Sequence, residues 1–263
     1  MRTSVSIAAL LIGACAVPLS GQKLVVDSLV AVQPFGDSLR YSWPIVRIPG
    51  NYAIARLINK DLYMWGEHYV DSDTAGSRYF DGVWGDGTGG MIQMYPPEWS
   101  WARPLENVLV ITITAEWCGA YCEGSTEHYH YDPRDGSRVR FDSLFTSEGL
   151  RLVKHRVREG WRKVVLEYLT ALRDTAGLSP SEMDTDWSMG VIDLYERCLA
   201  ERSTTEPYVS DMLIGPDGIT VWVARCSAHI ELASDELMEV EIPLSRAELV
   251  PLLRRPVLKW LGW

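Results

Sequence analysis

The alternation of apolar and polar positions along the chain predicts several β-strands. It is clearest over residues 107–117, where every second residue from Leu109 onward is apolar. Successive side chains of a strand point to opposite faces, so this strand has one wholly apolar face. Pro44 interrupts another extended segment and indicates an edge strand, because proline lacks the N–H that a central strand must donate. Weaker patterns predict further strands over residues 23–33, 40–48, 91–95, 211–214, 219–225 and 237–242.

Apolar residues at helical spacing predict three helices, over residues 54–65, 147–176 and 189–201. Gly160 is a point at which the longest of these patterns could divide into two segments. Ser245 and Glu248 form a capping box that opens a short last helix. A hairpin is predicted over residues 126–141, around a turn in which Gly136 supplies a positive φ.

These strands and helices come in runs rather than in strict alternation. We therefore predict an α+β fold, with a largely antiparallel sheet packed against a long helix pair. The chain has 263 residues, of which 47% are hydrophobic, which is enough apolar surface to exclude a disordered protein. We assign residues 23–263 to a single domain of this kind.

The N-terminus predicts export. Arg2 precedes an uncharged stretch, residues 4–16, that ends in small residues and is typical of a secretory signal, which we place at residues 1–16. A permanent membrane-spanning helix needs about 20 apolar residues, and no segment of this chain qualifies. Two processing routes stay open, an ordinary signal-peptidase site or a lipobox in which Cys15 is lipidated. We favour the lipoprotein and expect a periplasmic or outer-membrane location in a bacterium.

The charge and the aromatic content narrow the classes of partner. The chain has 25 Lys and Arg against 35 Asp and Glu, a formal net charge of −10, which argues against a nucleic-acid partner. It contains 11 Trp and 12 Tyr but only 4 Phe. Trp and Tyr combine an apolar ring with a polar tip, so they suit wet binding surfaces as well as cores.

The cysteines fit an oxidising compartment. Without Cys15 an even set remains, namely Cys118, Cys122, Cys198 and Cys226. Three residues separate the first two, whereas redox motifs of the Cys-x-x-Cys type have two. We therefore predict a structural disulfide between this pair and, by elimination, a second between the other two, although four cysteines allow three connectivities.

The densest group of potentially reactive side chains lies between the predicted central strand and the hairpin. It comprises Cys118, Cys122, Glu123, Glu127, His128, His130 and Asp132. In a strand, His128, His130 and Asp132 would share one face and could hold a divalent metal. The alternative is a solvated hairpin strand whose Asp132 caps the turn, and we favour it, expecting neither a metal nor a cofactor. No nucleophile, phosphate-loop or dinucleotide motif is present.

Aromatic residues on both sides of the central strand form a candidate binding surface. Trp99 and Trp101 are two positions apart, which places both rings on one face of a strand. The alternative is that such rings pack beneath their own loops. The predicted ligand-binding residues are Trp84, Trp99, Trp101, Trp117, Tyr121, Glu123, Gly124 and His128.

Short motifs along residues 42–254 occur in an order that matches a known family. They are Tyr41-Ser42-Trp43-Pro44, a helix containing Asn59, the strand over residues 108–115, Tyr131-Asp132-Pro133-Arg134-Asp135-Gly136, Phe141-Asp142-Ser143-Leu144-Phe145, and the closing segments 214–221 and 240–244. In this order the chain resembles the RsiV-like domain of unknown function. That domain is the extracytoplasmic module of a lysozyme-sensing anti-sigma factor, and it also occurs beside a peptidoglycan deacetylase domain. The chain departs from the family in the loop after the central strand, where Cys122-Glu123-Gly124-Ser125-Thr126 replaces a Gly-Gly-Ala-His-Pro-like sequence.

The resemblance and the absence of a consistent catalytic constellation lead to one functional expectation. We expect a non-catalytic cell-envelope module that binds a protein or a peptidoglycan or other glycan. The acidic chain suits a basic partner such as a lysozyme-like protein, through electrostatic steering. Sigma-factor control and deacetylation are not implied, because the corresponding segments are not found in this sequence. The alternative is an envelope hydrolase that uses Glu123, Glu127, His128, His130 or Asp132, with or without zinc.

Overall fold

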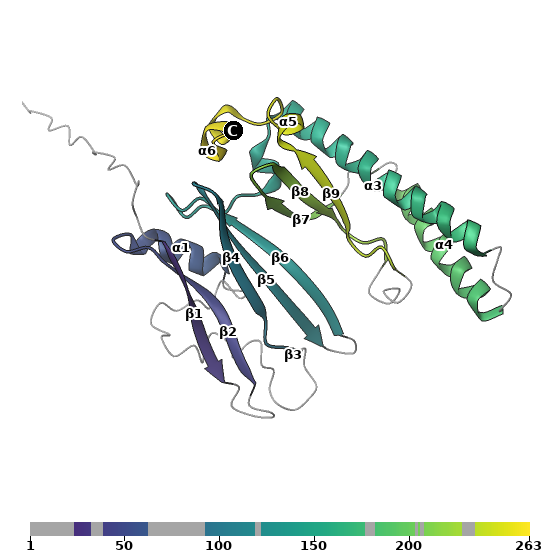
Figure 1. Ribbon diagram of the computed structural model, residues 1–263, viewed down its shortest axis with the longest axis horizontal. Helices are drawn as coiled ribbons and strands as arrows, with labels where there is room; N and C mark the ends of the chain where they lie inside the picture. Colours follow the sequence, from purple (N-terminus) through teal and green to yellow (C-terminus); the bar gives the residue numbers. More distant parts are fainter. Residues whose placement is uncertain are drawn as a thin grey trace, which may run out of the picture.

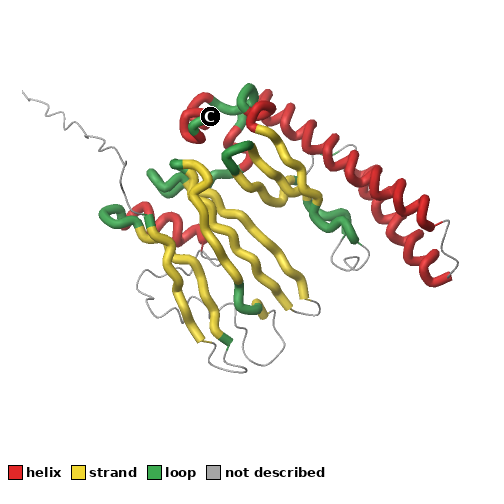
Figure 2. The backbone as a smooth tube through the Cα atoms, viewed as in Figure 1, coloured by secondary structure: helices red, strands yellow, loops and turns green. Residues whose placement is uncertain are grey.

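Three antiparallel sheets and five α-helices make up the part of the chain that can be described (Figures 1 and 2). The computed structural model describes residues 24–32, 39–62, 93–118, 122–176, 182–202, 205, 208–227 and 235–263. The α+β class and the long helix pair are confirmed. The expected single sheet is instead divided into three within these residues. The signal sequence and Cys15 lie outside the described residues.

The first sheet is a hairpin of β1 (Val25–Val32) and β2 (Arg40–Arg47), and α1 (Tyr52–Leu62) packs against it. The edge position expected from Pro44 is confirmed within the described residues, where β2 pairs with β1 along one side. Asn59 of α1 covers part of the other side. Its Oδ1 accepts a hydrogen bond from the Val46 N–H at 2.8 Å, and its Nδ2 donates to the Val46 carbonyl at 3.0 Å.

The second sheet is centred on β5 (Val108–Cys118). β6 (Cys122–Tyr131) pairs along one edge, while β3 (Gln93–Met94) and β4 (Glu98–Leu105) pair with the other. The hairpin predicted over residues 126–141 is present next to its turn, where Arg138 forms a bridge to Tyr131 and the Val139 N–H donates to the His130 carbonyl. The long ladder of β6 is formed with β5 instead. The turn itself has the expected chemistry, because Gly136 has a φ of 76° and the Asp132 carboxylate accepts a hydrogen bond from the Arg134 N–H.

The two faces of β5 belong to two different hydrophobic cores. The apolar face seen in the sequence, including Leu109, Ile111 and Ile113, packs in a first core with the β1–β2 hairpin and α1. Val108 and Val110 on the opposite face belong to a second core. β5 thus lies between the two cores and contributes side chains to both, so the two halves of the molecule, one around each core, share this strand.

The second core lies between the third sheet and the helices. This sheet contains β7 (Val209–Ile214), β8 (Gly218–Val223) and β9 (Val240–Ser245), and it packs against α3 (Ser147–Ala176) and α4 (Glu182–Arg202), the long pair in Figure 1. A short turn of helix, η2 (Phe141–Leu144), leads into α3. None of the described helices has both the length and the apolar character needed to cross a membrane.

α3 continues without a break through Gly160, contrary to the division that this glycine suggested. A Cβ at this position would lie 3.2 Å from side-chain carbons of Ile242, so the glycine allows α3 to lie close against β9. The capping box is confirmed, because the Ser245 side chain caps α5 (Arg246–Leu249) and Glu248 bonds back to it. The final helix, α6 (Arg255–Leu261), was not expected from the sequence pattern.

Candidate functional site

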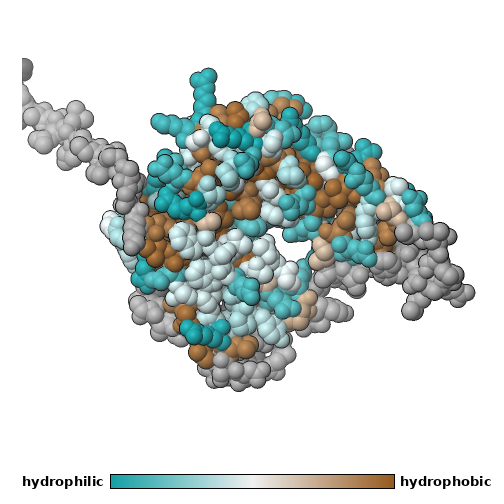
Figure 3. Space-filling model, viewed as in Figure 1, coloured by the Kyte–Doolittle hydropathy of each residue, from teal (hydrophilic) through white to brown (hydrophobic). Residues whose placement is uncertain are grey.

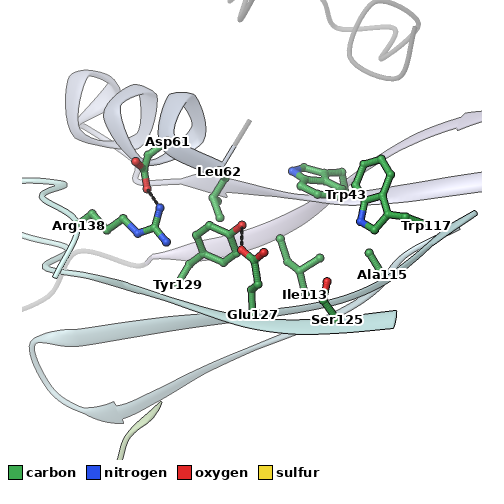
Figure 4. A pocket seen from close by; sticks show the side chains of 10 residues that line it. All are labelled: Trp43, Asp61, Leu62, Ile113, Ala115, Trp117, Ser125, Glu127, Tyr129 and Arg138. Atoms are coloured by element: carbon green, nitrogen blue, oxygen red, sulfur yellow. Dashed lines mark hydrogen bonds and ion pairs between the residues drawn. The ribbon is translucent and has the colours of Figure 1, made fainter. Parts of the chain in front are cut away.

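A pocket with a volume of about 320 Å³ lies between the second sheet and the β2–α1 unit (Figure 4). Its residues come from β2, from the end of α1, from one face of β5 and β6, and from the segment after the β6 turn. They are Trp43, Asp61, Leu62, Ile113, Ala115, Trp117, Ser125, Glu127, Tyr129 and Arg138. The volume falls near the lower end of the range for small-molecule sites.

One end of the pocket is aromatic. Trp43 projects from β2 and is 2% exposed, and Trp117 projects from the apolar face of β5. Figure 4 shows the two indoles beside one another, with Ile113 and Ala115 nearby. The position of Trp117 follows from the strand alternation that places it on the same face as Ile113 and Ala115.

The other end is polar, and its groups are already arranged by contacts with one another. Arg138 lies 3.5 Å from the Asp61 carboxylate, and its guanidinium carbon is 4.6 Å from the centre of the Tyr129 ring. The Tyr129 hydroxyl donates a hydrogen bond of 2.5 Å to Glu127, and the Tyr131 hydroxyl donates one of 2.7 Å to Asp61. Figure 4 shows Asp61, Arg138, Tyr129 and Glu127 grouped on the side away from the indoles.

The two phenols in this arrangement stay protonated. Burial, followed by the hydrogen bond to Glu127, raises the pKa of Tyr129 well above its usual range. Burial and the neighbouring Asp61 charge do the same to the pKa of Tyr131. Each carboxylate therefore accepts a hydrogen bond from a neutral phenol. With two carboxylates and one guanidinium, the lining has a formal charge of −1.

The two histidines of the predicted cluster lie on the face of β6 that points away from the pocket. Their side chains contact β7 and so connect the second sheet with the third. His128 Nδ1 lies 2.5 Å from Asp211, and its ring stacks on Trp222 at 5.0 Å between centroids. His130 Nε2 accepts a hydrogen bond from the Ile214 N–H at 3.1 Å. Neither imidazole lines the pocket that contains Glu127.

His130 is held in its neutral form. Burial, followed by the proximity of His128, lowers its pKa to about 3. The Ile214 N–H requires an acceptor at Nε2, which places the proton on Nδ1. His130 is 1% exposed, so it acts as a buried hydrogen-bond acceptor between β6 and β7.

The remaining members of the cluster are also dispersed. Asp132 pairs with Arg134 at 2.6 Å within the turn, and Glu123 forms an ion pair with Arg225. Among the residues that the structure describes, the one group close enough to share an ion is Glu116 with Cys118 and Cys122, whose sulfurs are bonded to each other. The five residues proposed for a hydrolase therefore do not converge on one point.

The predicted binding residues lie in several different places. Trp117 lines the pocket, whereas the Trp99 indole donates to the Ser42 hydroxyl at 2.9 Å and Trp101 is 42% exposed on the same strand. Gly124 is exposed on β6. Trp84 and Tyr121 lie outside the described residues. In Figure 3 the surface over β4, β5 and β6 is mainly pale, so this face has no large apolar patch over these strands.

Sequence reasoning missed most of the pocket. Tyr129 could have been found, because it shares alternate positions of β6 with Glu127 and therefore the face opposite the histidines. Trp43, Asp61 and Arg138 come from segments that no local pattern joins to β6.

Both disulfides are present as predicted. Cys118 pairs with Cys122 across the start of the β5–β6 ladder, with 4.0 Å between the Cα atoms. Cys198 of α4 pairs with Cys226 beyond β8, with 5.6 Å between the Cα atoms. The first disulfide closes the end of the second sheet from which Trp117 projects, one residue before Cys118.

Comparison with known proteins gives a likeness in fold. No protein-family model and no curated protein matches the sequence. Among solved structures, a DUF3298 family protein from Pseudomonas aeruginosa PAO1 aligns with a TM-score of 0.50 at 11% identity, over 90% of this chain and 96% of its own. A DUF3298 family member from Bacteroides fragilis NCTC 9343 aligns with a TM-score of 0.55 at 11% identity, over 91% and 97%. The chain is thus similar in fold to DUF3298 family proteins over about nine tenths of its length.

Proposed function

We propose that this chain is an exported, non-catalytic binding module of the bacterial cell envelope, and that its pocket takes a sugar unit of a glycan. The observation that supports this most directly is the division of the pocket. The indoles of Trp43 and Trp117 occupy one end, and the carboxylates of Asp61 and Glu127 lie at the other.

This division fits the chemistry of a sugar ring. A pyranose has apolar C–H faces, which pack on an aromatic ring, and a rim of hydroxyls, which donate to charged acceptors. Glu127 and Asp61 provide such acceptors, and their orientation is set in advance by the Tyr129 and Tyr131 hydroxyls. A site arranged before binding loses less entropy when the ligand enters.

The cellular setting is also part of the proposal. The N-terminal segment has the features of a secretory signal, and two disulfides fit an oxidising compartment. Lipidation at Cys15 would anchor the module to a membrane. Membership of the RsiV-like family, proposed from the order of the sequence motifs, would add a lysozyme-like protein as a second class of partner.

One observation favours the alternative of an envelope hydrolase. Glu127 and Asp61 line the same pocket, and glycosidases use a pair of carboxylates. Of the residues first considered for such an enzyme, only Glu127 is in this pocket. The same binding experiment separates the two functions when its products are analysed.

The test is isothermal titration calorimetry of the purified protein with chitotetraose, with soluble peptidoglycan fragments and with a lysozyme. Binding of the glycans should be seen, and Trp117→Ala should weaken it at least tenfold, because the variant removes the more accessible of the two indoles. Trp101→Ala is the matched control, since this tryptophan is exposed on β4 and does not line the pocket. Its affinity should stay within about twofold of the parent protein.

Each other outcome has a defined meaning. Absence of heat with every glycan would overturn the proposal, and binding of a lysozyme alone would favour a protein partner. Release of shortened sugars during incubation would favour the hydrolase. Equal losses in both tryptophan variants would place the glycan outside this pocket.

A further inference from the structure

We infer that the sugar unit in this pocket carries a free amino group, so that the ligand is a hexosamine lacking its N-acetyl group. This rests on the proposed function, because it specifies the chemistry of a ligand for the same pocket. The inference comes from the balance of charge among Asp61, Arg138 and Glu127, and from the aromatic surfaces opposite them.

The charges of Asp61 and Arg138 are largely satisfied by each other. Their side chains are 3.5 Å apart, and Arg138 is also held over the ring of Tyr129. Asp61 further accepts from the Tyr131 hydroxyl at 2.7 Å. This pair therefore leaves little net charge for a ligand to compensate.

Glu127 differs from Asp61 because no cation in the described part of the chain pairs with it. Its contact is the hydrogen bond that Oε2 accepts from the Tyr129 hydroxyl. A neutral phenol orients the carboxylate without supplying a positive charge, so the formal charge of Glu127 is not offset by a neighbouring cation among the described residues. The net charge of −10 on the whole chain has the same sign.

The aromatic end sets the orientation of the sugar. Trp117 lines the same cavity as Glu127, at the end away from the carboxylates. A sugar whose C–H face packs on this indole would present its polar substituents to the other end, where a protonated amino group would be favoured by the carboxylate of Glu127.

An N-acetyl group would not have this advantage. Its N–H can still donate to the carboxylate, but the group is neutral, and its carbonyl oxygen is an acceptor that cannot bond to a carboxylate. A pocket whose uncompensated group is an anion therefore distinguishes an amino sugar from its acetylated form by charge.

The experiment compares two chitotetraoses of equal length, one fully N-acetylated and one with a single free amino group, by isothermal titration calorimetry. A single charge keeps general attraction to the acidic chain small. The amino form should bind about three- to tenfold more tightly, a modest ratio because Glu127 is solvent-exposed. Raising the salt concentration should reduce this ratio, since the attraction is screened.

Glu127→Gln tests the residue assigned to the preference. Glutamine keeps the size of the side chain and can still accept from the Tyr129 hydroxyl, but it has no charge. The ratio of affinities should fall below about twofold. The acetylated sugar should lose less affinity than the amino sugar, because the amide oxygen of glutamine can still accept from a sugar hydroxyl. Glu123→Gln is the matched control, because this glutamate lies on the same strand, outside the pocket and paired with Arg225. It should leave the ratio unchanged.

The outcomes separate the inference from the proposed function. Equal binding of both sugars, or tighter binding of the acetylated one, would overturn the inference and leave glycan binding in place. An unchanged ratio in Glu127→Gln would overturn the role of this carboxylate. Absence of binding to either sugar would overturn the proposed function together with the inference.

Discussion

Protonation of His130 should destabilise the folded protein by an amount that follows from its burial. The imidazole is 1% exposed, and its Nε2 accepts a hydrogen bond from the Ile214 N–H. A proton on Nε2 would replace this acceptor with a second donor and bury a positive charge. The folded state therefore holds the pKa at about 3, well below the ordinary value of 6.5.

The sign and size of this pH dependence follow from the difference between the pKa of His130 in the folded state and in the unfolded state. The pKa of His130 is lower in the folded state than in the unfolded state. Its contribution to the free energy of unfolding is therefore complete above pH 6.5 and is lost as the pH falls towards 3. Each pH unit below 6.5 removes about 1.4 kcal/mol, so the two units down to pH 4.5 remove roughly 3 kcal/mol.

The measurement is urea unfolding, followed by tryptophan fluorescence at pH 7.5 and pH 4.5, for the parent protein and His130→Gln. Glutamine can place an acceptor near the position of Nε2 and does not titrate. Carboxylates also contribute to the pH dependence, but they are common to both proteins and cancel in the comparison. His130→Gln should lose roughly 3 kcal/mol less than the parent between the two pH values.

His155→Gln, an exposed position on α3, is the matched control and should behave like the parent. The reasoning would be refuted if the parent and His130→Gln lost the same free energy of unfolding over this pH range. That result would mean that the buried imidazole accepts its proton without a penalty.

Three further changes should alter the free energy of unfolding, each measured by the same urea titration at pH 7.5. Gly160→Val should destabilise by about 1–3 kcal/mol, because its side chain would meet β9, whereas Gly190→Val, which has nothing within 4 Å, should cost less than about 1 kcal/mol. An equal cost for the two would contradict the close packing of α3 on β9. Asn59→Leu should cost about 2–4 kcal/mol, because it leaves a backbone N–H and a carbonyl of β2 without their partner, and a change below about 1 kcal/mol would show that water replaces both bonds. Replacing Cys198 and Cys226 with alanine should cost about 3.6 kcal/mol from the entropy of a 28-residue loop, and unchanged stability would exclude this disulfide from the folded protein.

Elements that depend on local pattern could be predicted from the sequence. The alternation in β5, the periodicity of α3 and the capping box at Ser245 each arise within a short stretch of chain, and all three are confirmed. The pairing of β6 could not be predicted in this way, because turns are possible at both of its ends. The ladder with β5 runs the whole length of β6, whereas the segment after Gly136 offers a single bridge.

The candidate pocket is a property of tertiary packing, and its sequence signal is correspondingly weak. Trp43, Asp61 and Arg138 lie on separate elements, and the packing of the β1–β2 hairpin and α1 on the second sheet brings them together. The alternation of side chains along β6 identifies the face that contains Glu127. It does not identify which distant elements pack against that face. In the sequence, the spacing of His128 and His130 suggested a metal site. In the structure, both side chains hydrogen-bond to β7 and so connect the second sheet with the third.

The shared position of β5 has a consequence for how the molecule melts. Loss of either core would expose one side of a strand whose other side is still packed, so neither half can open without weakening its neighbour. The two halves are thereby coupled in free energy, and calorimetry should record one cooperative heat-absorption peak rather than two. If the two halves were produced as separate fragments, the fragment without β5 would have an incomplete hydrophobic core.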